Sequence, residues 1–130
     1  MMAKKRVALV LLGVLLILIS CTSAYARWSN TSDITIDLSI SNGCAVLSAY
    51  VAGYSGTTKI TATAVLERKN SNGTYTEIEK WTNISSNSTS LGWTATRYVT
   101  KGYTYRFTFT PTVYRNGTGE TVSASKSTNA

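Results

Sequence analysis

The sequence predicts an all-β protein, a β-sandwich of seven short strands that follows an N-terminal export signal. Apolar and polar side chains alternate with a period of two in several segments, and no window shows the 3.6-residue period of an amphipathic helix. Turn signals rich in Gly and Asn recur about every 8–12 residues. Threonine, which is β-branched and favours strands, is abundant between these turns.

Residues 1–26 have the organisation of a secretory signal peptide. Basic residues at 4–6 precede an apolar run over residues 7–19, which is shorter than the roughly 20 residues that a membrane-spanning helix needs. The segment ends in Ala-Tyr-Ala, the small-x-small pattern of a signal peptidase site. We therefore predict cleavage between Ala26 and Arg27 and a secreted protein.

Lipoprotein processing is the alternative. Residues 18–21, Leu-Ile-Ser-Cys, resemble the lipobox of bacterial lipoproteins, in which the cysteine is lipidated and becomes the first residue. Processing at Cys21 would anchor the protein to the cell surface. We favour the secreted form, because lipidation at Cys21 would leave only a short tether between the lipid and the domain and would make the later site at Ala26 superfluous.

The charge of the mature chain indicates which partners to expect. Three of the 13 basic residues lie in the signal and none of the six acidic ones does, so the mature chain carries a net charge of +4. The basic residues are dispersed, and export separates the protein from nucleic acid, so we expect no nucleic-acid partner. The sequence has no second long apolar stretch, so we expect no transmembrane span in the mature chain. We expect an extracellular ligand, which is a cell-wall polymer, a glycan or a protein.

Histidine and cysteine usage argue against catalysis. The sequence contains no His, which excludes a Ser-His-Asp triad, a Cys-His pair and a His metal site. Cys44 is the one cysteine that remains after cleavage, so it is either a free, packed thiol or a bridge between two chains. No Gly-x-Ser-x-Gly elbow and no Asp-rich calcium loop occurs. We predict a protein that is not an enzyme and has no metal or cofactor.

The first three strands are predicted from strict alternation. They cover residues 33–41, 45–52 and 59–69, and the Asn-Gly dipeptide after the first strand is a strong hairpin signal. Either face of the second strand could be buried. We place its small and aliphatic set inside, namely Ala45, Leu47, Ala49 and Val51. In the third strand we place inside Ile60, Ala62, Ala64 and Leu66.

The remaining strands are less regular. We predict them over residues 74–82, 89–98, 103–110 and 120–125. In the fourth strand Tyr75, Ile78 and Trp81 are spaced by three, so they share a face only if a β-bulge interrupts the alternation. A polar loop is expected over 83–88. The domain is predicted to cover 27–126 and to end in a frayed tail, 127–130.

Seven strands in about 100 residues are typical of an immunoglobulin-like sandwich. Tyr105 and Phe107, near the start of the sixth strand, lie where such folds place a tyrosine corner and the second cysteine of the inter-sheet disulfide. Since that disulfide is absent, the fibronectin type III or bacterial immunoglobulin-like variety is favoured.

Segments 53–60, 66–75 and 115–125 resemble a family of small, secreted, single-domain β-sandwich proteins of Gram-positive, spore-forming bacteria. The family has no assigned activity. The resemblance therefore implies a fold and export, and it implies no site.

Two groups of residues are candidates for chemistry. Glu77 and Glu79 are predicted to share one face of the fourth strand, as the acid and base of a glycosidase would, but we favour the solvated face of a strand as their explanation. Among the aromatic residues, we expect most Tyr, with Trp81 and Trp93, to fill or brace the core. Trp28 and Tyr54 are the aromatics predicted to be exposed and to contact a ligand.

We therefore predict a non-catalytic extracellular binding or adhesion module. One alternative is a carbohydrate-binding module that stacks exposed Trp and Tyr on sugar rings. A second alternative is a structural subunit that assembles through edge strands.

Overall fold

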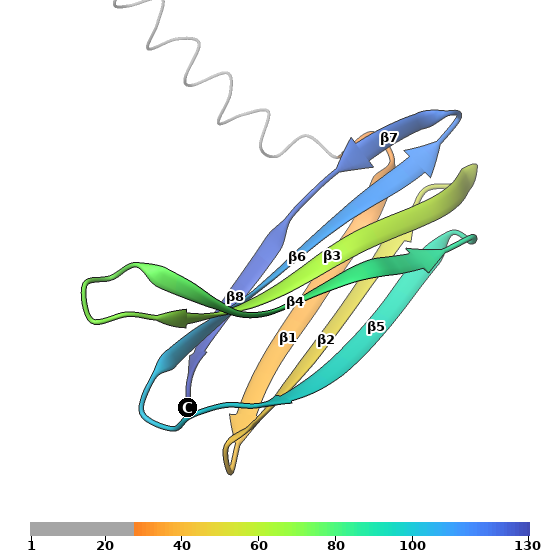
Figure 1. The fold of residues 1–130 in the computed structure, drawn as a ribbon. Coiled ribbons are helices and arrows are strands. Elements are labelled where there is room, and N and C mark those ends of the chain that lie inside the picture. Colours follow the sequence, from red (N-terminus) through yellow and green to blue (C-terminus); the bar gives the residue numbers. More distant parts are fainter. Residues whose placement is uncertain (1–27) are drawn as a thin grey trace, which may run out of the picture.

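The structure, a computed structural model, describes residues 28–130, which form two antiparallel sheets packed face to face (Figure 1). The predicted signal peptide of residues 1–26, its cleavage between Ala26 and Arg27 and lipidation at Cys21 lie outside the described residues.

The described residues form eight strands, so the predicted β-sandwich is confirmed with one strand more than expected. Their bounds, in chain order, are β1 (Thr31–Ser41), β2 (Cys44–Gly53), β3 (Thr57–Lys69), β4 (Tyr75–Ser86), β5 (Ser90–Tyr98), β6 (Thr104–Arg115), β7 (Thr118–Thr121) and β8 (Ala124–Asn129).

One sheet has the order β1-β2-β5, and the other has the order β4-β3-β6-β7 with β8 also paired to β6. The two long sides of the sandwich differ. On one side β1 and β8 lie next to each other, and the Lys126 ammonium pairs with the Asp37 carboxylate between them. On the other side fewer residues of β4 approach β5, and the contacts between them include the Trp81–Trp93 ring pair and the ion pair of Glu79 with Arg97.

The core lies between the sheets, where alternate residues of each strand point inward. The face predicted for the second strand is confirmed, because its four small and aliphatic residues are buried while Val46 and Tyr50 are each 45% exposed. The inward residues predicted for the third strand are also all buried. The Trp93 ring packs on Phe107 and Phe109 at 6.0 Å between centroids and joins the two sheets.

The Asn-Gly turns form as predicted. Asn42 and Gly43 have φ of 51° and 74°, and Asn116 and Gly117 have φ of 53° and 77°. Two successive positive φ angles characterise the type I′ turn, whose twist matches that of a hairpin. The tyrosine corner forms as well, since the Tyr105 hydroxyl donates a hydrogen bond to the Thr100 carbonyl at 2.8 Å.

The predicted end of the fourth strand at Thr82 is wrong, because β4 continues to Ser86. The pairing of β3 with β4 shifts twice, and Asn83 adopts a positive φ of 59° at one of these irregularities. Of the predicted trio, Ile78 and Trp81 pack against the core, and Ile84 joins them. Tyr75 does not, because it lies opposite Lys69 and its ring contacts the Arg106 guanidinium. The bulge at Asn83 lets the polar segment after it keep pairing with β3.

The predicted seventh strand is two strands, and the predicted fraying of residues 127–130 is wrong up to Asn129. Residues 124–129 form β8 along β6. Pro111 explains the break between β7 and β8. Its carbonyl accepts the Val122 N–H at 3.0 Å, so its backbone faces this side of β6, where the missing proline N–H interrupts the ladder.

Candidate functional site

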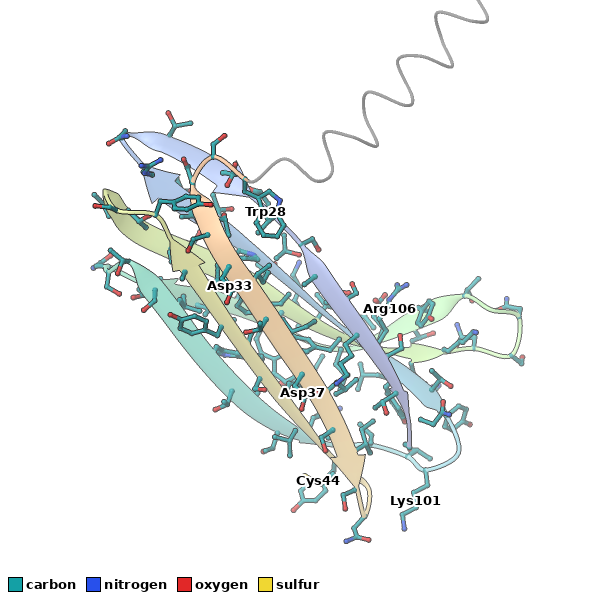
Figure 2. All side chains as sticks on the ribbon, turned by 180° about the vertical axis from the view of Figure 1, so that it is seen from behind. Trp28, Asp33, Asp37, Cys44, Lys101 and Arg106 are labelled. Atoms are coloured by element: carbon teal, nitrogen blue, oxygen red, sulfur yellow. The ribbon has the colours of Figure 1, made fainter. Side chains whose placement is uncertain are left out.

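The two aromatics predicted to contact a ligand do not form a platform. Trp28, which precedes β1 in the chain (Figure 2), is 44% exposed. Tyr54 is half-buried, with the Arg115 guanidinium 5.7 Å from its ring centroid. The aromatic contacts among residues 28–130 involve four other rings, those of Trp81, Trp93, Phe107 and Phe109.

The segment around Trp28 is held by a structural clamp. The Glu120 carboxylate accepts the backbone N–H groups of the three residues that lead into β1, Ser29, Asn30 and Thr31, at 2.6, 2.9 and 2.9 Å. Partial burial raises the pKa of Glu120, but these hydrogen bonds outweigh burial and hold the pKa below its ordinary value. The buried Asn30 amide donates to two carbonyls of the β6–β7 hairpin, at 2.8 Å each.

The wider expectation for the aromatics holds for tryptophan and fails for tyrosine. Trp81 and Trp93 are partly buried, pack against the core and contact each other edge to face at 5.4 Å. Four tyrosines are exposed instead of buried. They are Tyr50, Tyr98, Tyr103 and Tyr114.

Glu77 and Glu79 do not share a face. The pairing shift next to Leu66 places Glu79 opposite that inward residue and Glu77 opposite Glu67. The bulge therefore separates the two carboxylates that regular alternation would bring together. Glu79 approaches Arg97 of β5 instead, with Oε1 2.8 Å from Nε.

The feature with the most specific chemistry is a cavity of about 370 Å³ at one end of the sandwich, which we name the arginine cavity. It receives side chains from both sheets and from the loop between β5 and β6. Its lining residues are Arg68, Ile78, Arg97, Tyr98, Val99, Thr100 and Tyr105.

Both arginines of this cavity carry unsatisfied groups. The Nε atoms of Arg68 and Arg97 are buried, and neither makes a hydrogen bond of good geometry within the described residues. The contact between Arg97 and Glu79 is an ion pair by distance, but its direction does not meet the geometry of a hydrogen bond. Arg68 stacks over the Tyr103 ring at 4.6 Å. Two arginines thus line one cavity, and Glu79 is the ion-pair partner of Arg97 alone.

Neither Arg68 nor Arg97 was predicted as a site residue, although the sequence contains a signal for both. Arg68 continues the inward series that ends at Leu66, and Arg97 continues the series Leu91, Trp93 and Ala95. A charged residue at an inward position is unusual because its burial costs free energy unless it is paired. Recognising the two strand ends as neighbours requires the tertiary structure.

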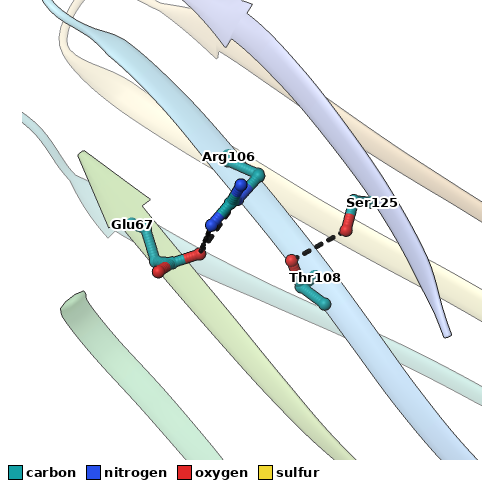
Figure 3. Close-up of polar contacts among 4 residues, drawn as sticks. All are labelled: Glu67, Arg106, Thr108 and Ser125. Carbon is teal, nitrogen blue, oxygen red and sulfur yellow. Dashed lines mark hydrogen bonds and ion pairs between the residues drawn. The ribbon is translucent and has the colours of Figure 1, made fainter. Parts of the chain in front are cut away.

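Two other hollows lie on the outer faces of the sheets. One, of about 390 Å³, surrounds Tyr50 on the β1-β2-β5 sheet, and the other, of about 550 Å³, is lined by hydroxyls of the second sheet. The outer face of the second sheet satisfies many of its own polar groups, as Figure 3 illustrates. Thr108 and Ser125 hydroxyls lie 2.9 Å apart, and Arg106 donates twice to Glu67, at 3.0 and 2.8 Å. Polar groups that already have hydrogen-bond partners gain less free energy from a ligand than the partnerless Nε of Arg68 in the arginine cavity would.

No group of three or more Asp, Glu, His or Cys among residues 28–130 could hold a metal ion. Cys44 is a half-buried free thiol whose Sγ lies 4.0 Å from the Ala45 carbonyl. In this range no helix has the length and hydropathy needed to cross a membrane.

Comparison with known proteins finds a distant structural likeness and no match by sequence. No protein-family model matches the sequence, and no curated protein matches it. Among solved structures, the chain is similar to that described as the solution structure of R. palustris CsgH, with a TM-score of 0.42 and 8% sequence identity, over 70% of this chain and 88% of that one. A likeness this distant carries no information about function.

Proposed function

We propose that this protein is a non-catalytic extracellular binding module that receives an anionic group of a cell-wall polymer in the arginine cavity. The observation that carries the proposal is the buried Nε of Arg68, which makes no hydrogen bond among the described residues, together with Arg97, whose Nε lies 2.8 Å from Glu79 in a direction outside hydrogen-bond geometry. A guanidinium offers planar, paired donors that match the oxygens of a carboxylate or phosphate. The net charge of +4 that we predict for the mature chain favours the same partner.

Electrostatics within the cavity support an anion over a neutral sugar. Arg97 has Glu79 as its ion-pair partner, and the side chains of both are 39% exposed, so solvent weakens their attraction. Arg68 stacks on Tyr103, which holds the guanidinium in place without neutralising it. An incoming anion would gain hydrogen bonds from donors that are already oriented, and it would compete with Glu79 for Arg97.

The test compares retention on isolated bacterial cell wall, before and after removal of its anionic polymers, with retention on neutral polysaccharides. We expect retention on the intact wall alone. Arg68→Gln and Arg97→Gln each remove a charge-assisted hydrogen bond and should weaken binding about tenfold. Lys80→Gln, an exposed change of the same charge, is the control and should have little effect.

A second pair of variants makes the test more specific. Glu79→Gln removes the carboxylate that competes for Arg97 and should strengthen binding. Glu77→Gln removes the same charge at an exposed position and should change it little. Equal effects of the two Glu variants, or of Lys80→Gln and Arg68→Gln, would indicate diffuse attraction and contradict the cavity as the site. Retention on a neutral polysaccharide with a shift in Trp fluorescence would favour a carbohydrate-binding module instead.

A further inference from the structure

We propose that β5 pairs antiparallel with β5 of a second copy of this chain, so that the three-stranded sheets of two copies join into one continuous sheet. This inference does not rest on the arginine cavity. It rests on the backbone and side chains of β5, which is an edge strand of the β1-β2-β5 sheet (Figure 1).

The backbone groups of β5 alternate between bonding to β2 and facing the free edge of the sheet. The Thr89 carbonyl accepts the Gly53 N–H, and the Val99 N–H donates to the Gly43 carbonyl, both at 2.8 Å. Backbone groups alternate in direction along a strand, so the odd-numbered residues between Thr89 and Val99 bond to β2. The even-numbered residues therefore direct their N–H and C=O groups to the free edge. Hydroxyls of Ser86 and Ser88 cover the Ser90 carbonyl at one end of this edge.

Other outer strands are protected, as edge strands of monomeric proteins usually are. β1 is next to β8, and the ion pair of Asp37 with Lys126 links them. β4 carries two β-bulges and three charged side chains, Glu77, Glu79 and Lys80, which oppose pairing with another strand.

β5 lacks these protections. It contains neither Lys nor Pro, and its pairing with β2 has no bulge. Its charged residue, Arg97, is on the inward face and pairs with Glu79. The outward side chains next to the free edge are uncharged and exposed, namely Gly92, Thr94, Thr96 and Tyr98, the last of which is 80% exposed.

The free edge of β5 is complementary to itself, which favours a second copy of this chain over a foreign peptide as its partner. A two-fold axis through Ala95 places Thr94 of one copy opposite Thr96 of the other and Gly92 opposite Tyr98. All four residues present backbone groups to the free edge, and no like charges meet. A tyrosine opposite an edge glycine covers backbone that glycine leaves exposed. The partner would also cover Trp81 and Trp93, which are partly buried at the seam between β4 and β5.

The experiment measures molar mass by sedimentation equilibrium from micromolar to millimolar concentration. The full chain is expressed and exported by its host, and mass spectrometry identifies the N-terminus of the product. We expect a concentration-dependent shift from monomer to dimer. Amide hydrogen exchange gives the register, since the Thr94 and Thr96 N–H groups should become protected as the dimer forms.

The double variant Thr94→Lys/Thr96→Lys places like charges directly opposite each other in this register and should weaken dimerisation about tenfold. The control Thr35→Lys/Ser39→Lys adds the same charge to exposed positions of β1, and it should dimerise as the wild type does. Circular dichroism verifies that both variants fold. A wild type that stays monomeric up to millimolar concentration would overturn the proposal, as would a dimer that leaves the Thr94 and Thr96 amides unprotected.

Discussion

The Glu120 clamp gives the sharpest stability prediction. Glu120→Ala removes the acceptor of three backbone N–H groups that fix the start of β1 to the β6–β7 hairpin. The hydrogen bonds to Asn30 and Thr31 are partly buried, whereas the one to Ser29 is exposed. Water can replace the exposed bond, but two partly buried donors would lose their partner.

The magnitude follows from these two donors. A buried donor without a partner costs about 1–3 kcal/mol, and partial access to water places this site toward the lower end. We expect Glu120→Ala to lower the free energy of unfolding by about 2–4 kcal/mol. For a domain of this size that corresponds to a decrease in Tm of at least about 8 °C.

The pH dependence follows from the direction of the Glu120 pKa. Because the folded state holds this pKa below its ordinary value, the unfolded state binds more protons as the medium is acidified. The stabilising contribution of Glu120 is thus complete above the unfolded-state pKa and is lost as the pH falls through the lower, folded-state pKa. At a pH below both pKa values, the free energies of unfolding of the wild type and Glu120→Ala should differ less than they do at neutral pH.

Urea unfolding followed by Trp fluorescence, at neutral pH and at several acidic values, measures both effects. Glu77→Ala is the matched control, because this carboxylate is exposed and makes no hydrogen bond or ion pair among those of residues 28–130; it should change stability by less than about 0.5 kcal/mol. If Glu120→Ala is as stable as the control at neutral pH, the clamp does not stabilise the fold and this reasoning is refuted.

Two further predictions test the tyrosine corner and the core. Tyr105→Phe removes the hydroxyl that bonds to the Thr100 carbonyl and should cost about 1 kcal/mol in urea unfolding, whereas Tyr98→Phe, at an exposed ring, should cost nothing measurable. If Tyr105→Phe is as stable as Tyr98→Phe, the hydrogen bond of the tyrosine corner does not stabilise the fold. Leu47→Ala opens a cavity in the core and should cost about 2–5 kcal/mol, whereas Val46→Ala on the opposite face should change Tm little. Comparable losses at both positions would contradict the assigned face of β2.

The alternation of side chains determined much of this fold without tertiary information. The inward series from Ala45 to Val51 is buried as predicted, because a one-residue change of face would place polar side chains in the core. The Asn-Gly turns were equally predictable, since both of their residues tolerate positive φ. The three-residue spacing of Tyr75, Ile78 and Trp81 indicated a β-bulge, and the pairing of β3 with β4 does shift, although Tyr75 does not join the other two against the core.

The sequence alone misplaced features that depend on a partner strand. The tail up to Asn129 looks too polar for a strand, but pairing with β6 satisfies its backbone. Glu77 and Glu79 seemed to share a face because the position of a bulge depends on register with β3. The proximity of Arg68 and Arg97 was not predicted because they lie on strands of different sheets, whose packing the local pattern does not specify.

The local pattern by itself determined that this chain folds as a β-sandwich and which faces of its regular strands are buried. The alternation of side chains carries that information within a few residues. The tertiary structure decided which strand ends meet and which edges are left unpaired. The arginine cavity and the free edge of β5 both arise from long-range packing of two sheets, in which residues far apart in sequence become neighbours.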